Sequence, residues 1–490
     1  MAQTREDVIR DRQDLTQGSI GKKLLMFSIP IIGGTLVQQL YNVVDSLVVG
    51  NFVGSDALAA VSASFSSMMV FNALFMGLST GANIIISQYK GAQDHDSLER
   101  AMNATVTLSL LLGIFITVVG YIMCKPLLLL LKTPENIMGD SLTYIRIIFI
   151  GTIGNILYNG LTGMVRGLGD TKYPFYALLI ASVMNIILDL LFVIAFHWDV
   201  AGVAWATIIS QFCSGLFILF RLFGDHYPGR LTLKGLLRLD GPIIKTILQL
   251  GIPSAIQDVA MSLGFMVVQR VSNSFGSDYI ASSSIVMKAD GFAVMPMMGL
   301  GTAITTFVGQ NIGAGNRERV NEGVKKVNWV TAGIGLAVGI ILFFCGKWIG
   351  RAFTDNAKVI EMTGEGLKIL AFCYIFMGLR NIYAGALRGA GAVSIAAITT
   401  LAGTLVRIPL AWLMGSIPMN RAIKAAVAAG TYASEDLARA AGVGQECYRG
   451  MFASMAVSML LAWAISFAFY KFSHWQDKGI TAQAKAASEK

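Results

Sequence analysis

Long apolar stretches recur along the whole chain, separated by short polar segments. A helix needs about 20 apolar residues to cross a bilayer, and longer stretches are typical of tilted or kinked membrane helices. The pattern therefore predicts an all-α integral membrane protein with twelve transmembrane helices. The predicted spans are residues 24–49, 57–87, 104–131, 141–165, 174–197, 200–222, 246–271, 280–310, 327–350, 366–387, 393–417 and 451–471.

The second half of the chain repeats the first with a constant offset of 222 residues from residue 54 onward. An even number of spans in each half keeps both halves in the same orientation, which is a parallel repeat. We therefore expect two pseudo-symmetric six-helix bundles around a central cavity; two fused but inert bundles are the alternative. The clearest matched pairs are VGSDALAAVS (53–62) with FGSDYIASSS (275–284), SQYKGA (87–92) with GQNIGA (309–314), and NGLTGMVRGLG (159–169) with NIYAGALRGAG (381–391).

The repeat and the apolar pattern together divide the chain. Between the last two spans, Ser434 followed by Glu435 and Asp436 is typical of a helix start. The predicted parts are a cytoplasmic N-terminal segment (1–23), a first bundle (24–222), a cytoplasmic linker (223–245), a second bundle (246–471) with an extracytoplasmic insertion (419–449), and a cytoplasmic tail (472–490).

The net charge of +9 does not indicate a nucleic-acid partner, because the basic residues are distributed unequally between the loops on the two sides of the membrane. Loops 51–56 and 198–199 carry no Lys or Arg, whereas the linker carries four. This positive-inside bias predicts a multi-pass protein of the plasma (cytoplasmic) membrane with both termini in the cytoplasm. Residues 1–23 lack the apolar core of a cleavable signal peptide. The linker's basic residues are Arg230, Lys234, Arg238 and Lys245.

The sequence contains no pattern typical of an enzyme. The four histidines are dispersed, the five cysteines form no CxxC pair, and no GxxxxGK[ST] loop occurs. We therefore expect no enzymatic activity, no cofactor and no direct drive by ATP.

Asp45 lies inside the first span, where a lipid-facing carboxylate would cost roughly 3 kcal/mol. Counted along the helices, Asp45, Asp189 in the fifth span and Thr207 in the sixth fall in one layer of the outer half-membrane. Asn185 lies one turn from Asp189 on the same helix face. Two carboxyl groups, an amide and a hydroxyl are thus predicted to converge in the first bundle.

Such a cluster can hold a cation. A carboxyl group in a low-dielectric site resists ionisation, and two close together titrate as a coupled pair. The pair can bind a proton or, with oxygens from Asn185 and Thr207, a sodium ion. The alternative is that each acid only locks helix packing.

Four further residues are weaker candidates. Asn159 in the fourth span is a polar candidate for the cation site, although its repeat mate Asn381 favours a packing role. In the second half, Asp258 and Lys288 are candidates to line the cavity. Pro30 removes a backbone hydrogen bond near the start of the first span, which is either a hinge or a static kink.

The stretch SIPIIGGTLVQQLYNVVDSLVVGNFVG (28–54), the MGLSTGANIIISQYKGA stretch (76–92), the MVRGLGDTKYP turn (164–174) and the twelve-span repeat resemble the multidrug and toxic compound extrusion (MATE) family. Pro30 with Asp45, and Asn185-x-x-x-Asp189, resemble its DinF-like branch. The resemblance implies efflux of organic, often cationic compounds, driven by inward flow of H⁺ or Na⁺. It also implies that Asp45 and Asp189 belong to a first-half cation site, and that Pro30 takes part in bending of its helix.

We therefore expect a secondary active multidrug antiporter working by alternating access, monomeric, in the lipid bilayer, with small organic cations or drugs as partners. H⁺ is favoured as the coupling ion because Na⁺ needs several fixed neutral oxygens. The alternative is a lipid-linked oligosaccharide flippase of the same superfamily, for which the acids at Asp45 and Asp189 are less suited. A channel or a non-transporting scaffold is a third class.

Overall fold

The computed structural model describes residues 14–130, 133–224 and 226–480, and within these ranges the chain is helical with no strand. Within these ranges ten helices are long and apolar enough to cross a membrane, and the number is eleven if a pair bent by 51° is counted as one span. Helix α3, with 37 residues, lies at the second predicted span, and the prediction of an all-α membrane fold is confirmed. The first bundle comprises α2 (Ile20–Val48), α3 (Ser55–Gly91), α4 (His95–Leu130), α5 (Glu135–Gly167), α6 (Lys172–Leu190) and α7 (Asp199–Leu222).

The second bundle repeats this order after a short helix, α8 (Leu233–Leu236). The tenth predicted span, 366–387, is the bent pair, which breaks at residues 371–372. The bundle comprises α9 (Gly241–Ser272), α10 (Ser277–Gly313), α11 (Arg317–Phe353), the pair α12 (Ala357–Leu370) and α13 (Cys373–Gly389), α14 (Val393–Ala411), α15 (Ile417–Ala428), α16 (Glu435–Ala440) and α17 (Tyr448–Phe472).

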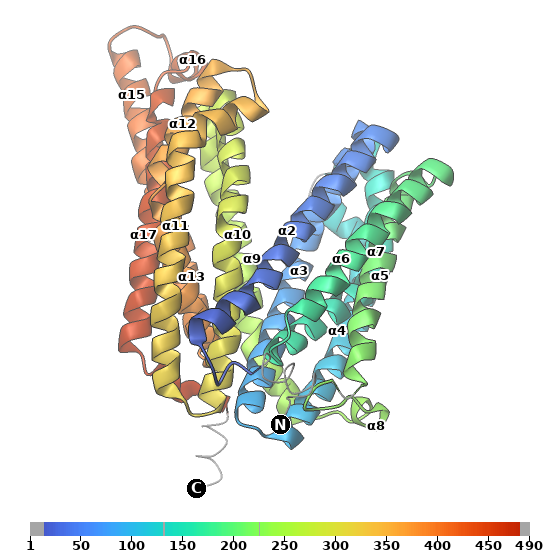
Figure 1. Cartoon of the computed structure of the whole chain (residues 1–490). Helices are drawn as coiled ribbons and strands as arrows, with labels where there is room; N and C mark the ends of the chain where they lie inside the picture. Colours follow the sequence, from blue (N-terminus) through green and yellow to red (C-terminus); the bar gives the residue numbers. More distant parts are fainter. Residues whose placement is uncertain (1–13, 131–132, 225, 481–490) are drawn as a thin grey trace.

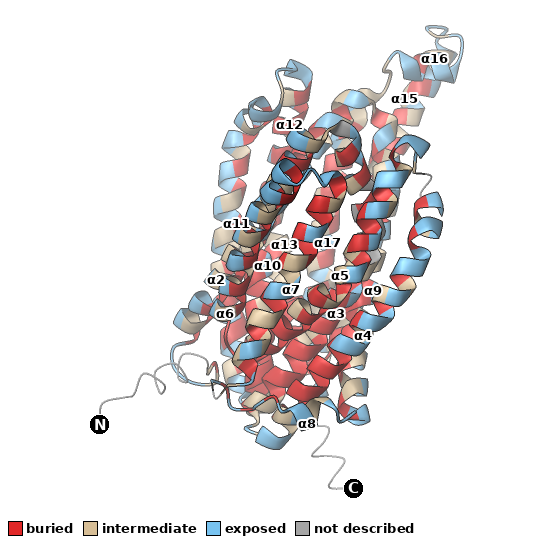
Figure 2. Cartoon of the chain, turned by 90° about the vertical axis from the view of Figure 1, so that its right-hand side faces the viewer, coloured by how far each residue is buried: buried red, intermediate tan, exposed pale blue. Residues whose placement is uncertain are grey.

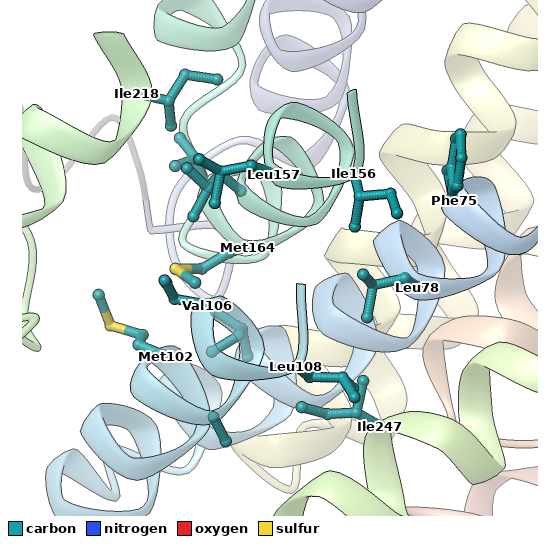
Figure 3. Packing of buried hydrophobic residues seen from close by; sticks show 14 of the residues in the cluster. Phe75, Leu78, Met102, Val106, Leu108, Ile156, Leu157, Met164, Ile218 and Ile247 are labelled. Carbon is teal, nitrogen blue, oxygen red and sulfur yellow. The ribbon is translucent and has the colours of Figure 1, made fainter. Parts of the chain in front are cut away.

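The two bundles meet at one end and diverge toward the other, as Figure 1 shows. We call these the closed end and the far end. The closed end holds α8, the start of α2 and the end of α17, and buried residues are concentrated toward it (Figure 2). Helix α9 packs there into the core of the first bundle, where Ile247 lies beside Leu78 and Leu108 (Figure 3).

Glycines permit this close approach of the bundles. A Cβ at Gly77 of α3 would lie 2.6 Å from the carbonyl oxygen of Gly251 of α9, closer than any real Cβ contact. Helices with larger residues at these positions would have to stand further apart, since backbone atoms cannot rotate away as side chains do.

Helix α2 belongs to both bundles. Its first half packs with α10 through Leu24, Phe27 and Ile31, which share a buried cluster with Leu300 of the second bundle. Its last residues pack in the first bundle, where Val48 is buried. Pro30 lies within the part of α2 that packs against the second bundle, three residues before Gly33, which faces Phe175 of α6.

The linker that follows α7 is attached to the first bundle. Thr107 donates to the carbonyl oxygen of Leu236 at 2.8 Å, and Arg100 forms an ion pair with Asp240 at 2.7 Å. Tyr227 donates to Asp170 at 3.0 Å. Burial and the neighbouring Asp170 carboxylate raise the pKa of the Tyr227 hydroxyl, so this group keeps its proton and remains a donor.

The segment between α14 and α17 forms a helical cap at the far end, seen at the upper left of Figure 1. The predicted helix start at Ser434 is confirmed: its hydroxyl accepts from the Leu437 N–H at 3.3 Å, with Glu435 and Asp436 in the first turn of α16. Arg439 of α16 donates to Asn420 of α15 at 3.2 Å.

Candidate functional site: a carboxyl pair in the first bundle

Asp45 and Asp189 come together from α2 and α6 in the half of the first bundle nearer the far end. Each lies just before a π-helical turn, at residues 49–53 and 191–195, and such turns are frequent at functional sites. Their carboxyl groups lie close enough for the charge of one to act on the other, and a proton held by either group relieves the repulsion between two carboxylates. Asp189 is fully buried and Asp45 is half-buried.

Asn185 and Thr207 complete the cluster that the sequence predicts. In the amide orientation that satisfies both neighbours, Asn185 donates to Asp189 Oδ2 at 2.9 Å and accepts from the Thr207 N–H at 3.3 Å. Asn185 thereby connects α6 to α7. The close spacing follows from the one-turn separation of Asn185 and Asp189 on α6.

Two tyrosines that the sequence analysis missed belong to the same cluster. The Tyr41 hydroxyl lies 3.3 Å from the Thr207 hydroxyl, and both Tyr41 and Tyr144 face the carboxyl pair. Tyr41 precedes Asp45 by four residues on α2, so the helical period offered a signal for it. Tyr144 comes from α5, and no local pattern connects it to Asp45.

The carboxyl pair has acceptor capacity left over. Among the described residues, one oxygen of Asp45 and one of Asp189, both Oδ1, are buried with no hydrogen-bond partner. A buried carboxylate oxygen without a donor is costly, and a proton or a small hard cation relieves that cost. Within the described chain, no group of three His, Cys, Asp or Glu side chains gathers as a metal-ligand set.

Asn159 lies apart from this cluster. It donates to the Asn155 side chain at 2.6 Å and to the Asn155 carbonyl oxygen at 2.9 Å. Asn159 is fifteen positions after Tyr144 on α5, so it lies roughly 22 Å along the helix from the carboxyl pair. Its contacts are local.

In the second bundle, Asp258 belongs to a chain of polar side chains. Gln257 donates to Asp258 at 3.3 Å and accepts from Arg388 of α13 at the same distance. Asp258 itself faces the Arg388 guanidinium. Asp258 of the second bundle thus faces a basic side chain, whereas Asp45 and Asp189 of the first bundle face each other.

Lys288 and Asp290 of α10 point to different neighbours, as their two-residue spacing predicts. The Lys288 ammonium lies 5.0 Å from the ring centroid of Phe353 at the end of α11, and Lys288 is exposed. Asp290 faces Tyr374 and Arg407. The Arg407 guanidinium lies 5.3 Å from the ring centroid of Phe265, and its Nε has no hydrogen-bond partner among the described residues.

Two repeated bundles that meet at one end and diverge at the other form the architecture of a membrane transporter. The MatE family model matches residues 30–191 and 253–413, once in each half. The chain therefore belongs to the MatE family, the MATE transporters.

Relatives and solved structures agree with this membership. The chain is 32% identical over 380 residues to the probable multidrug resistance protein YpnP of Bacillus subtilis, covering 78% of this chain and 85% of that protein. It is 26% identical over 402 residues to the probable multidrug resistance protein NorM of Thermotoga maritima, covering 81% and 86%. An outward-facing multidrug resistance MATE transporter of the MOP superfamily has the same fold, with a TM-score of 0.82 at 23% identity over 96% and 98% of the two chains.

Proposed function

We propose that the protein is a secondary active multidrug antiporter that exports small organic cations in exchange for H⁺. The observation that carries the proposal is the gathering of Asp45 and Asp189 in the first bundle, with one buried oxygen on each that no protein donor satisfies among the described residues. Two carboxyl groups in this geometry hold one proton, and a second proton makes the pair neutral. The names of the relatives, which are multidrug resistance proteins, support the class of substrate.

The closed end is proposed to face the cytoplasm. The linker with its basic residues lies at that end, whereas the loops at 51–56 and 198–199 carry no Lys or Arg. The carboxyl pair then lies in the outer half of the membrane, where protons from outside can reach it. Both termini lie in the cytoplasm in this orientation.

Protonation is proposed to release a substrate cation by removing the negative charge that attracts it. A carboxylate in low dielectric attracts an organic cation strongly, and a neutral carboxyl group does not. Asn185, Thr207 and Tyr41 position the pair by the contacts given above. The same oxygens would hold Na⁺ if sodium were the coupling ion.

Helix α2 is proposed to carry this change to the rest of the protein. It bears Asp45 in the first bundle, and its other half packs against the second bundle. Pro30 lies near the end of the part that packs against the second bundle, and it lacks the N–H that would donate a hydrogen bond within the helix there. A hinge at Pro30 would let the two parts move separately. Asp258 and Lys288 remain candidates for contact with the substrate.

The test is proton-driven efflux of a fluorescent cationic dye from cells or inverted vesicles, with and without sodium. We expect Asp45→Asn to abolish efflux that wild type performs with a proton gradient alone. Asp56→Asn is the matched control, because Asp56 is exposed in the first turn of α3. If wild-type efflux requires sodium, the carboxyl pair remains the proposed coupling site and the coupling ion is Na⁺ instead of H⁺.

Unimpaired efflux in Asp45→Asn would refute coupling through the carboxyl pair. Absence of dye transport by wild type would favour the alternative substrate class, the lipid-linked oligosaccharides.

A further inference from the structure

Two glutamines join the bundles at the closed end in a symmetric manner. Gln88 of α3 and Gln310 of α10 are repeat mates, 222 residues apart, and both are fully buried. The Gln88 amide nitrogen donates to the carbonyl oxygen of Gly389 at 2.9 Å, and that of Gln310 donates to Gly167 at 3.0 Å. Gly167 and Gly389 are repeat mates as well. Each bond crosses from one bundle to the other.

The amide oxygens of the same glutamines bind the two ends of the described chain. Gln310 Oε1 accepts from the backbone N–H of Leu15 at 3.0 Å. Gln88 Oε1 accepts from the backbone N–H of Ile480 at 2.7 Å. Each side-chain amide therefore uses its nitrogen for the opposite bundle and its oxygen for a terminal segment. We call these four bonds the glutamine clamp.

The segment at the N-terminal side is fixed to the second bundle before α2 leads into the first. Leu15 is 1% exposed. Its carbonyl oxygen accepts from Asn311 at 3.2 Å, and Arg319 donates to the carbonyl oxygens of Gln17 and Gly18 at 2.8 Å each.

The segment at the C-terminal side connects the bundles in the opposite direction. Asp477 forms an ion pair with Arg317 at 2.8 Å, and Gln476 donates to Asn321 at 2.8 Å, both at the start of α11 in the second bundle. Three residues further on, Ile480 packs against the core of the first bundle. Residues 475–480 therefore contact both bundles.

The clamp cannot survive separation of the bundles at this end. Gln88 and Gln310 lie where α3 and α10 cross, so separation would break both bonds between bundles at once. Each break leaves a buried amide or carbonyl group without a partner until water enters, and such a loss is costly.

We propose that Gln88 and Gln310 are the positioning residues that hold the closed end shut during transport, with the backbones of Leu15 and Ile480 as their second partners. The inference rests on the alternating access of the proposed function. The glutamines themselves need touch no substrate. Their hydrogen bonds exist only while the bundles meet at this end. They therefore stabilise the closed conformation and lower the population ratio of open to closed protein.

The test measures the distance between the bundles directly. Asp96 of α4 and Glu318 of α11 are exposed repeat mates in first turns at the closed end, so spin labels on D96C and E318C report separation there. The labels go into full-length protein in nanodiscs without substrate. The native cysteines to be replaced are Cys124, Cys213, Cys345, Cys373 and Cys447.

We expect Gln88→Ala and Gln310→Ala each to raise the open-to-closed population ratio by about tenfold, and the double variant by more. The two single effects should be similar because the contacts are symmetric. The matched control is Gln249→Ala, since Gln249 is an exposed glutamine of α9 near the same end. Its distance distribution should match that of wild type.

A second pair of variants tests the terminal contact at Ile480, the last residue that the structure describes. Ile480→Pro removes the N–H that Gln88 accepts, whereas Ile480→Val keeps it. We expect Ile480→Pro to raise the population ratio about threefold over Ile480→Val. Distance distributions in Gln88→Ala, Gln310→Ala and Ile480→Pro that match wild type would overturn the clamp.

The outcome is separable from that of the coupling experiment, because the distance measurement needs neither dye nor ion gradient. A shift in the glutamine variants together with normal efflux in Asp45→Asn would leave the clamp standing and reject the coupling site. Unchanged distances in the glutamine variants together with loss of efflux in Asp45→Asn would reject the clamp and leave the coupling site standing.

Discussion

Alanine at Gly91 or Gly313 is predicted to force the bundles apart at the closed end. Gly91 ends α3 and Gly313 ends α10, and they are repeat mates. A Cβ at Gly91 would overlap the backbone carbonyl oxygen of Gln310, and one at Gly313 would overlap that of Gln88. The perturbation is a single methyl group placed in the crossing of two helices.

The magnitude follows from what the methyl group meets. An ordinary Cβ contact lies at 3.4–4 Å, and both substituted positions would fall far below the 3.0 Å that real Cβ atoms respect. The obstacle is backbone in both cases, so the helices themselves must separate by roughly 1 Å or more. Overpacking of this kind costs about 1–3 kcal/mol, which corresponds to a shift of roughly 5- to 150-fold in the population ratio.

The assay is the D96C/E318C distance measurement, followed by dye efflux in vesicles. Gly21→Ala is the control, because Gly21 lies in α2 near the same end and its Cβ would meet nothing within 4 Å. That control should leave the distances unchanged, as alanine only favours the helix by about 0.5–1 kcal/mol. If Gly91→Ala and Gly313→Ala both behave like Gly21→Ala, the close crossing does not determine the closed end.

Three further predictions concern other contacts. Asp290→Ala removes a carboxylate near the buried Arg407 and should lower the free energy of unfolding in micelles by about 1 kcal/mol, measured by denaturant titration; an unchanged midpoint would exclude an attraction between the two groups. Arg449→Gln removes a two-bond contact with Glu365 at the far end and should shift the midpoint of the same titration only slightly, because the Arg449 side chain is exposed to solvent. Tyr41→Phe removes a hydroxyl beside the carboxyl pair and should slow dye efflux several-fold with a change in stability below about 1.5 kcal/mol; a rate equal to wild type would exclude Tyr41 from the site.

The positions of the spans and the gathering of Asp45, Asp189, Asn185 and Thr207 were predictable from the sequence. Apolar length determines where a helix crosses the membrane, and counting residues along a helix gives the depth of each side chain. Polar residues of α2, α6 and α7 that lie at one depth in the same bundle are then expected to contact one another. Tyr144 could not be found this way, because depth does not specify which face of α5 turns toward α2.

The sequence by itself determined the membrane-spanning helices, the repeat and the layer of polar residues, since these follow from local composition and from helical geometry. The residues of the glutamine clamp also lie in repeated segments of the sequence, which are SQYKGA with GQNIGA, and NGLTGMVRGLG with NIYAGALRGAG. Only the tertiary structure decided that Gln88 binds Gly389 and Gln310 binds Gly167, because these contacts join residues about 300 and 140 positions apart. Such pairings depend on how two bundles pack against each other, and no period along one helix records that packing.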